Sequence, residues 1–212
     1  MWRKMIALFC ILLGLLLIAT PFLKDQMVAH LQKKNQATEL TGKEVAENRA
    51  LRARYDYDTI QPPSVMNVMK ASLKDYKQSI VGQISIKQVG LELPILKGMT
   101  SDNLLAGAGT MRADQQMGVG NYPLAGHHMK RTHLLFGPLL EVKKGARIEL
   151  TDFQSTYVYK VTDKQIVSEK EMDVIGPSEG SKVTLVTCDV PTETNKRLIV
   201  QGELVSKKPY RK

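Results

Sequence analysis

The sequence predicts an all-β domain, a barrel or a sandwich, attached to one membrane-spanning helix. Nineteen uncharged and mostly aliphatic residues occupy positions 5–23, close to the roughly 20 that a helix needs to cross a hydrocarbon core. Further along, short β-branched or alternating runs replace the helical pattern. About seven or eight such strands in roughly 145 residues are enough for one domain with its own core.

The apolar segment at positions 5–23 is expected to remain as an uncleaved anchor. It is longer than the roughly 7–15 apolar residues of a signal peptide, and no good cleavage site precedes Pro21. Arg3 and Lys4 come directly before the span, so the positive-inside tendency places the N-terminus in the cytoplasm. Everything from Lys24 onward is then extracellular, although further lysines after the span weaken this rule.

Residues 24–63 are expected to form an extracellular stalk that is partly helical. The stretch "EVAENRALRAR" at 44–54 is rich in helix formers, and Thr41-Gly42 interrupts the pattern before it. The proline pair within 61–64 marks the end of this stalk.

The catalytic or binding domain is expected to cover residues 64–205, followed by a basic tail at 206–212. A short helix should open it, because Val65, Val68, Met69 and Leu73 recur on one face at helical spacing. The run "HLLFGPLLEV" is a second candidate helix. The expected strands lie at 79–86, 91–96, 121–126, 146–153, 155–167, 182–188 and 197–205.

The formal net charge of +9 is concentrated at the two ends of the chain. Residues 1–60 carry a net +3 and residues 206–212 a net +4, whereas residues 61–205 carry only +2. The ends can touch anionic membrane lipid or wall polymer, or simply keep the chain soluble. The sequence has no basic stripe with interleaved aromatic residues, so nucleic acid is not an expected partner.

Cys188 ends the run at 182–188 and has no disulfide partner within the chain. The other cysteine, Cys10, lies in the apolar span and cannot reach a sulfur in an external domain. Many lone strand cysteines are small core residues. In an exported domain, however, an unpaired thiol indicates a reactive group or an intermolecular bond.

Two histidines and an arginine are candidate partners for this thiol. His127 and His128 follow the run at 121–126, and Arg197 opens the last run. Neighbours in an extended chain point to opposite faces, so only one histidine is expected at the site. An imidazole can take the proton of a thiol to form a nucleophile, and a guanidinium can stabilise an oxyanion. Structural roles for all three residues fit the same spacing.

Two other kinds of site find little support in the sequence. A zinc site built from His127, His128, His133 and Cys188 would lack compact ligand spacing, so no metal is expected. The glycine-rich "GAGTM" at 107–111 lacks the strand–glycine–helix context of a nucleotide site.

An N-terminal anchor followed by "LAGHHM" at 124–129, "TLVTCD" at 184–189 and "RLIV" at 197–200 resembles the sortase family in order and separation. The likeness covers about residues 65–205. It implies a closed eight-stranded β-barrel with short helices on a Gram-positive cell surface. It also implies a transpeptidase that cleaves LPxTG-type sorting signals of secreted proteins between Thr and Gly. The Thr carbonyl then passes, through a thioester, to an amine of a peptidoglycan precursor of the lipid II type.

The resemblance makes Cys188 the nucleophile, His127 the general acid and base, and Arg197 the group that positions the substrate or its oxyanion. It also implies contacts with the peptide from a further set of residues on the strands and on the loop before Cys188. These are Ala125, Val186, Thr187, Met172, Val174 and Ile175.

The resemblance is to the class A enzymes of this family. The segment 167–182 is too short for the long helix of class B, and the stalk lacks the Asp-Pro-aromatic lid of class C. No cofactor is expected. Calcium-activated members of the family carry several acidic residues in the loop that corresponds to 111–121, whereas Asp114 is the only acid there in this chain. An L,D-transpeptidase would need a different motif around Cys188. A non-catalytic β-domain that binds wall polymer is the remaining alternative.

Overall fold

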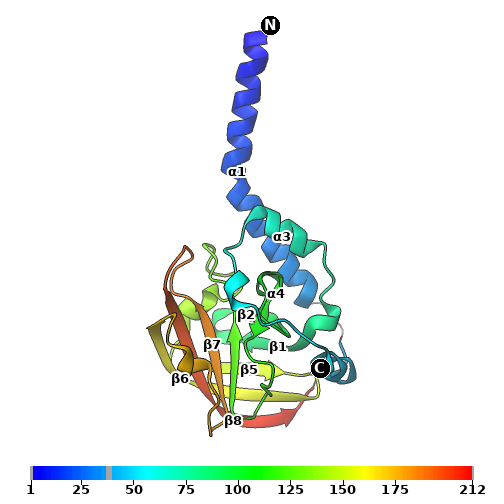
Figure 1. Ribbon diagram of the computed structural model, residues 1–212, viewed down its shortest axis with the longest axis vertical. Coiled ribbons are helices and arrows are strands. Elements are labelled where there is room, and N and C mark those ends of the chain that lie inside the picture. Colours follow the sequence, from blue (N-terminus) through cyan, green and yellow to red (C-terminus); the bar gives the residue numbers. More distant parts are fainter. Residues whose placement is uncertain (1, 37–39, 212) are drawn as a thin grey trace.

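The computed structural model describes residues 2–36 and 40–211, in which eight strands close into one barrel (Figure 1). The expected closed eight-stranded fold is therefore confirmed. The strands are β1 (Ile80–Ile86), β2 (Leu91–Leu96), β3 (Ala108–Thr110), β4 (Asn121–Ala125), β5 (Arg147–Thr151), β6 (Ser155–Ser168), β7 (Lys182–Cys188) and β8 (Lys196–Pro209).

The barrel has the strand order β1-β2-β3-β4-β7-β8-β6-β5, and β5 closes it by pairing with β1. Two of the pairings are parallel, β2 with β3 and β4 with β7, and the others are antiparallel. Inside the barrel, fully buried side chains from every part of the sheet form the main core. Among them are Ile84, Leu93, Leu124, Leu150, Tyr159, Leu185 and Val200.

Helices are short, apart from the first, and lie outside the barrel (Figure 1). The α-helices are α1 (Trp2–Gln36), α2 (Gly42–Ala50), α3 (Val65–Ser72) and α4 (Ser101–Ala106). Single 3₁₀ turns are η1 (Tyr57–Thr59), η2 (Lys77–Ser79), η3 (Lys87–Val89), η4 (Gly137–Glu141) and η5 (Met172–Ile175).

Two elements differ from the expected pattern. β3 was not expected, because three residues are too few to show strand periodicity; β3 is held by pairing with Ile95 of β2 and Ala125 of β4. The expected helix at 133–142 is only the 3₁₀ turn η4, since Gly137 packs against the backbone of Thr132 and Pro138 follows directly.

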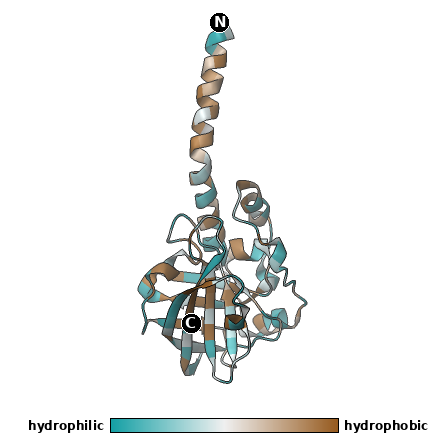
Figure 2. Cartoon of the chain, turned by 60° about the vertical axis from the view of Figure 1, so that its left-hand side comes forward, coloured by the Kyte–Doolittle hydropathy of each residue, from teal (hydrophilic) through white to brown (hydrophobic). Residues whose placement is uncertain are grey.

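The helix α1 has two parts with different surroundings. Its apolar first part is exposed and is long and apolar enough to cross a membrane (Figure 2). Its second part packs on the barrel, where Val28 and Leu31 are fully buried and Asp25 pairs with Arg131 at 3.2 Å. The residues after the span therefore lie against the barrel, whereas a free stalk would stand apart from it.

The helix α2 also packs on the barrel. Thr41, expected to interrupt a helix, instead begins one: its side chain accepts from the backbone of Glu44, whose carboxylate accepts from the Thr41 N–H, which forms a capping box. The amide of Asn48 then donates to the carbonyls of Lys77 and Ile80, both at 2.8 Å. Both helices of the segment 24–63 are thus fixed to the domain, and its boundaries remain a prediction.

The last strand extends beyond residue 205, where the sequence indicated that a separate basic tail begins. β8 runs to Pro209 and pairs with β6 throughout this extension. The ammonium of Lys207 lies 5.2 Å from the ring centre of Tyr157. This cation–π contact stabilises the charged residue within the strand.

Candidate active site

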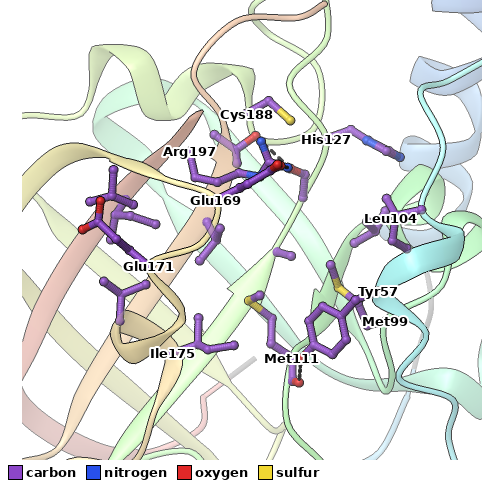
Figure 3. Close-up of a pocket in the computed structure, with 18 of the residues that line it drawn as sticks. Tyr57, Met99, Leu104, Met111, His127, Glu169, Glu171, Ile175, Cys188 and Arg197 are labelled. Atoms are coloured by element: carbon purple, nitrogen blue, oxygen red, sulfur yellow. Dashed lines mark hydrogen bonds and ion pairs between the residues drawn. The ribbon is translucent and has the colours of Figure 1, made fainter. Parts of the chain in front are cut away.

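The pairing of three strands brings the sequence-predicted catalytic residues to one end of the barrel. β4 and β7 run parallel with Ala125 opposite Val186, so the residues two positions later, His127 and Cys188, emerge at the same edge. β7 and β8 run antiparallel with Cys188 opposite Arg197. All three side chains line one cavity of about 480 Å³ (Figure 3).

The floor of this cavity is apolar. A second cluster of buried side chains, separate from the main core, lies beneath it, and every member of the cluster lines the cavity. Its members are Met99, Leu104, Met111, Ala125, Val167, Val186 and Ile199, with Ile60, Val174 and Ile175 packed against them.

The predicted substrate-contacting residues are mostly found in the cavity wall. Ala125, Val186 and Thr187 line it from the strands, and Val174 and Ile175 line it from η5. The Thr187 hydroxyl donates to the carbonyl of Gly126 at 2.8 Å and so joins the two strand ends beside the sulfur. The side chain of Met172 lies outside the described residues. Substrate contact by any of these residues remains a prediction.

Several cavity residues were not anticipated from the sequence. Tyr57, Asp58 and Ile60 belong to the segment expected to be a stalk, yet they line the cavity. Figure 3 shows Tyr57 across the cavity from Ile175 of η5. The Tyr57 hydroxyl bonds to the carbonyl of Met111, and residue 55 pairs with Met99, which holds this segment across the site. No sequence pattern marks these contacts, because they join residues more than 40 positions apart.

The wall formed by η5 depends on one buried amide. Asn121 Nδ2 donates to the carbonyls of Val174 at 3.0 Å and Gly176 at 2.8 Å, and its Oδ1 accepts from Thr184 at 2.8 Å. Asn121 is 3% exposed, so these carbonyls would lose their partner in a dry environment if the amide were removed. Asn121 therefore fixes the loop that carries Val174 and Ile175.

The surroundings of His127 favour the neutral form of its imidazole. It is 8% exposed, and its Nε2 has no hydrogen-bond partner among the described residues. Burial lowers the pKa of His127 to about 4, because the charged form would lose its water. In Figure 3 the ring extends away from the sulfur of Cys188. The ring is thus able to accept a proton once a side-chain rotation turns it to the thiol.

The surroundings of Cys188 likewise favour the neutral thiol. Burial raises its pKa above the ordinary value, Arg197 acts in the opposite direction, and Asp189 and Glu169 raise it further. The directions of both pKa shifts therefore favour a thiol and an uncharged imidazole in the resting site at neutral pH. Arg197 is the group that favours the thiolate.

The guanidinium of Arg197 is held in place by three oxygens of its surroundings. One Nη atom donates to the carbonyls of Thr194 at 3.0 Å and Lys196 at 2.9 Å, and the other pairs with Glu169 at 2.8 Å. The guanidinium is therefore fixed beside the sulfur, and Glu169, for which the sequence predicted no contact with Arg197, is its positioning partner (Figure 3).

The second histidine has a structural contact. His128 Nδ1 lies 2.9 Å from the carbonyl oxygen of Cys188, and residue 128 pairs with Leu135 in an isolated bridge. His128 does not line the cavity, whereas its neighbour His127 does. This arrangement agrees with the expectation that only one histidine faces the site. The catalytic role of His127 is still a prediction.

Between residues 2 and 36 and between 40 and 211, no group of three or more His, Cys, Asp or Glu side chains is placed to hold a metal ion. Asp114, the acid considered for calcium, forms a salt bridge with Arg112 at 2.6 Å. Independence from calcium stays a prediction.

Comparison with known proteins gives one consistent family. A family model described as a sortase domain matches residues 84–205. Sortase A of Listeria monocytogenes is 42% identical over 204 residues, which cover 96% of this chain and 92% of that protein. Sortase A of Bacillus anthracis is 36% identical over 206 residues, which cover 97% and 95%. The solved structure of the Listeria protein matches 63% of this chain and 92% of its own with a TM-score of 0.63 and 48% identity.

The neutral resting state predicts how the thiol responds to pH. In a Cys10→Ala background, alkylation of Cys188 by iodoacetamide should keep accelerating from about pH 7 to about pH 9, since a thiol with a raised pKa is still mostly protonated in that range. Arg197→Gln should slow the reaction, because it removes the favourable charge. A rate that is already constant below neutral pH would show a resting thiolate.

Proposed function

The chain belongs to the sortase family of cell-wall sorting transpeptidases, and we propose that Cys188, His127 and Arg197 perform its reaction on LPxTG-type sorting signals. The observation that carries this proposal is the convergence of the three side chains, from the ends of β7 and β8 and the loop after β4, on one cavity with an apolar floor. A thiol, a base and a fixed donor of hydrogen bonds are the parts that acyl transfer through a thioester needs.

The first half of the reaction breaks one peptide bond. His127 turns toward Cys188 and takes its proton, and the thiolate attacks the carbonyl carbon of the Thr residue of the signal. Arg197 donates to the developing oxyanion. His127, now protonated, gives its proton to the departing Gly amine. The products are a thioester on Cys188 and a free peptide that begins with Gly.

The second half forms a new amide bond. An amine of a peptidoglycan precursor, of the lipid II type, attacks the thioester carbonyl, and His127 accepts the proton of the attacking nitrogen. The sulfur leaves as the thiolate and is reprotonated. The buried His127 and the half-buried Cys188 favour transfer over hydrolysis, because their surroundings restrict the access of water to the thioester.

The apolar floor and the loops around it suit the signal peptide. Leu and Pro of the signal can bury their side chains against Met99, Leu104 and Ile199, where each buried methylene contributes about 0.8 kcal/mol. The η5 wall and the segment around Tyr57 lie on either side of this floor. Secreted proteins with an LPxTG motif are the proposed substrates.

The proposed location is the cell membrane, with a single span and an extracellular catalytic domain. The apolar first part of α1 is the one candidate span in the described part of the chain. Arg3 and Lys4 before it support a cytoplasmic N-terminus. Lipid is therefore a further proposed contact of the chain.

The reaction itself tests the proposal. The full chain in detergent, mixed with an LPxTG peptide and a series of amines, is expected to yield the peptide cleaved after Thr and joined to the amine, identified by mass spectrometry. Cys188→Ala should abolish both cleavage and transfer and keep the thermal unfolding transition, since only a sulfur at a strand end is removed. Turnover by this variant would exclude Cys188 as the nucleophile.

The two histidines should differ in their contribution. His127→Ala is expected to lower kcat/KM by about 10²- to 10⁴-fold, the usual contribution of a general acid and base. His128→Ala removes a hydrogen bond of about 1 kcal/mol to the Cys188 carbonyl, so kcat/KM of this variant should fall by no more than roughly tenfold. Equal losses in steady-state assays would mean that the catalytic histidine has been assigned incorrectly.

Asn121→Leu is expected to raise KM for the peptide several-fold with a smaller change in kcat. It leaves the carbonyls of Val174 and Gly176 without a donor and so loosens the η5 wall. Thr184→Val is the matched control, because it disturbs the same buried site but keeps both of those bonds. If both variants raised KM equally, the cause would be general destabilisation.

A further inference from the structure

The helix α3 exposes an apolar face that the barrel does not cover. Val68 and Ala71 are fully buried, whereas Met66 is 59% exposed, Met69 48% and Leu73, at the C-cap, 88%. The sequence pattern grouped Met69 and Leu73 with Val68 on one face of this helix, whereas in the structure Val68 is buried and the other two are exposed. Three large apolar side chains, three or four positions apart, therefore form one outward stripe, here called the α3 face.

The α3 face begins at the level where the apolar span ends. Lys24, the first charged residue after that span, donates from Nζ to the carbonyl of Pro63 at 3.2 Å. Ser64, the next residue, is the N-cap of α3. The first charge after a span marks the boundary between hydrocarbon and headgroups, so this bond places the start of α3 at that boundary.

The helix is also packed directly on α1. The buried residues Val68 and Ala71 of α3 belong to the same apolar cluster as Val28 and Leu31 of α1. Figure 2 shows α3 beside α1, at the top of the globular part, where the colour of α1 changes from hydrophobic to hydrophilic. Lipid that surrounds the span must therefore come up to α3.

The charges beside the stripe suit an anionic lipid surface. Lys70 lies on the same helix and is exposed, and Lys74 follows it, paired with Asp102. An apolar stripe with lysine at its border is the pattern of a helix that lies in the membrane interface, where the lysine stem extends to the headgroups.

We propose that the α3 face, Met66, Met69 and Leu73, lies in the interfacial layer of the bilayer next to the barrel and forms a second lipid contact beside the span. A span alone leaves a domain free to tilt, whereas two contacts fix its orientation. A protein partner would have to occupy the headgroup layer itself to cover the same face, so lipid is the occupant that the position favours.

The orientation set in this way turns the catalytic end of the barrel toward the membrane. Arg131, four residues after His127, pairs with Asp25 and lies 4.7 Å over the ring of Phe22, at the end of the span. Gln32 of the same helix accepts from the backbone N–H of Leu135 at 3.3 Å. The loop that follows His127 is thus held on the membrane side.

Fluorescence quenching by lipid tests the contact directly. Trp2 is the only tryptophan of the chain, so Trp2→Phe provides a background in which Met69→Trp or Leu73→Trp is the single emitter. Val119→Trp is the matched control: Val119 is 60% exposed and precedes β4, at the end of the barrel opposite His127. Each full-length variant is placed in nanodiscs of plain or brominated phosphatidylcholine.

Bromine quenches only tryptophan that reaches the acyl chains, so about twofold loss of emission is expected at positions 69 and 73 and little or none at 119. Equal emission in plain and brominated discs at both α3 positions would overturn the proposal. A blue-shifted but unquenched emission at these positions, together with dimers by mass photometry, would also overturn it, because a second copy would then cover the face. Two α3 variants are used so that one failure to fold does not remove the test.

Discussion

The parallel pairing of β4 with β7 aligns Ala125 with Val186 and so brings the residues beyond them, His127 and Cys188, to one edge of the barrel. The antiparallel return along β8 then places Arg197 opposite Cys188. Because side chains alternate along a strand, a shift of one residue in either pairing would turn the thiol or the guanidinium to the other face. The buried contacts of Asn121 with Thr184 and of Thr187 with Gly126 join the same two strands and hold this register.

The same burial that fixes the strands also determines the charge state of the site. His127 and Cys188 are both shifted toward their neutral forms by loss of water, and Arg197 is the cation that opposes this shift at the sulfur. In the proposed reaction, this neutral pair leaves the thiol unreactive until His127 turns toward it. In the same proposed reaction, the limited access of water that disfavours the thiolate at rest would also protect a thioester on Cys188.

The sequence was sufficient for the parts of the molecule that rest on local pattern. Short runs of apolar and β-branched residues predicted seven of the eight strands and the apolar span. The spacing of motifs along these runs indicated Cys188, His127 and Arg197. Contacts made by distant segments leave no such pattern. Tyr57 reaches the cavity through residues far along the chain, Glu169 becomes the partner of Arg197 only when β6 and β8 pair, and β3 is too short to show a period.

The central claim is that Cys188 carries the acyl group, and intact-mass spectrometry measures this directly. The protein is mixed with an LPxTG peptide in the absence of an amine and quenched in acid within the first turnovers. A mass increase equal to the peptide through its Thr, removed by hydroxylamine and located on Cys188 by digestion, is the expected result. Cleavage of the peptide with no adduct at any quench time, or an adduct on another residue, would contradict the account.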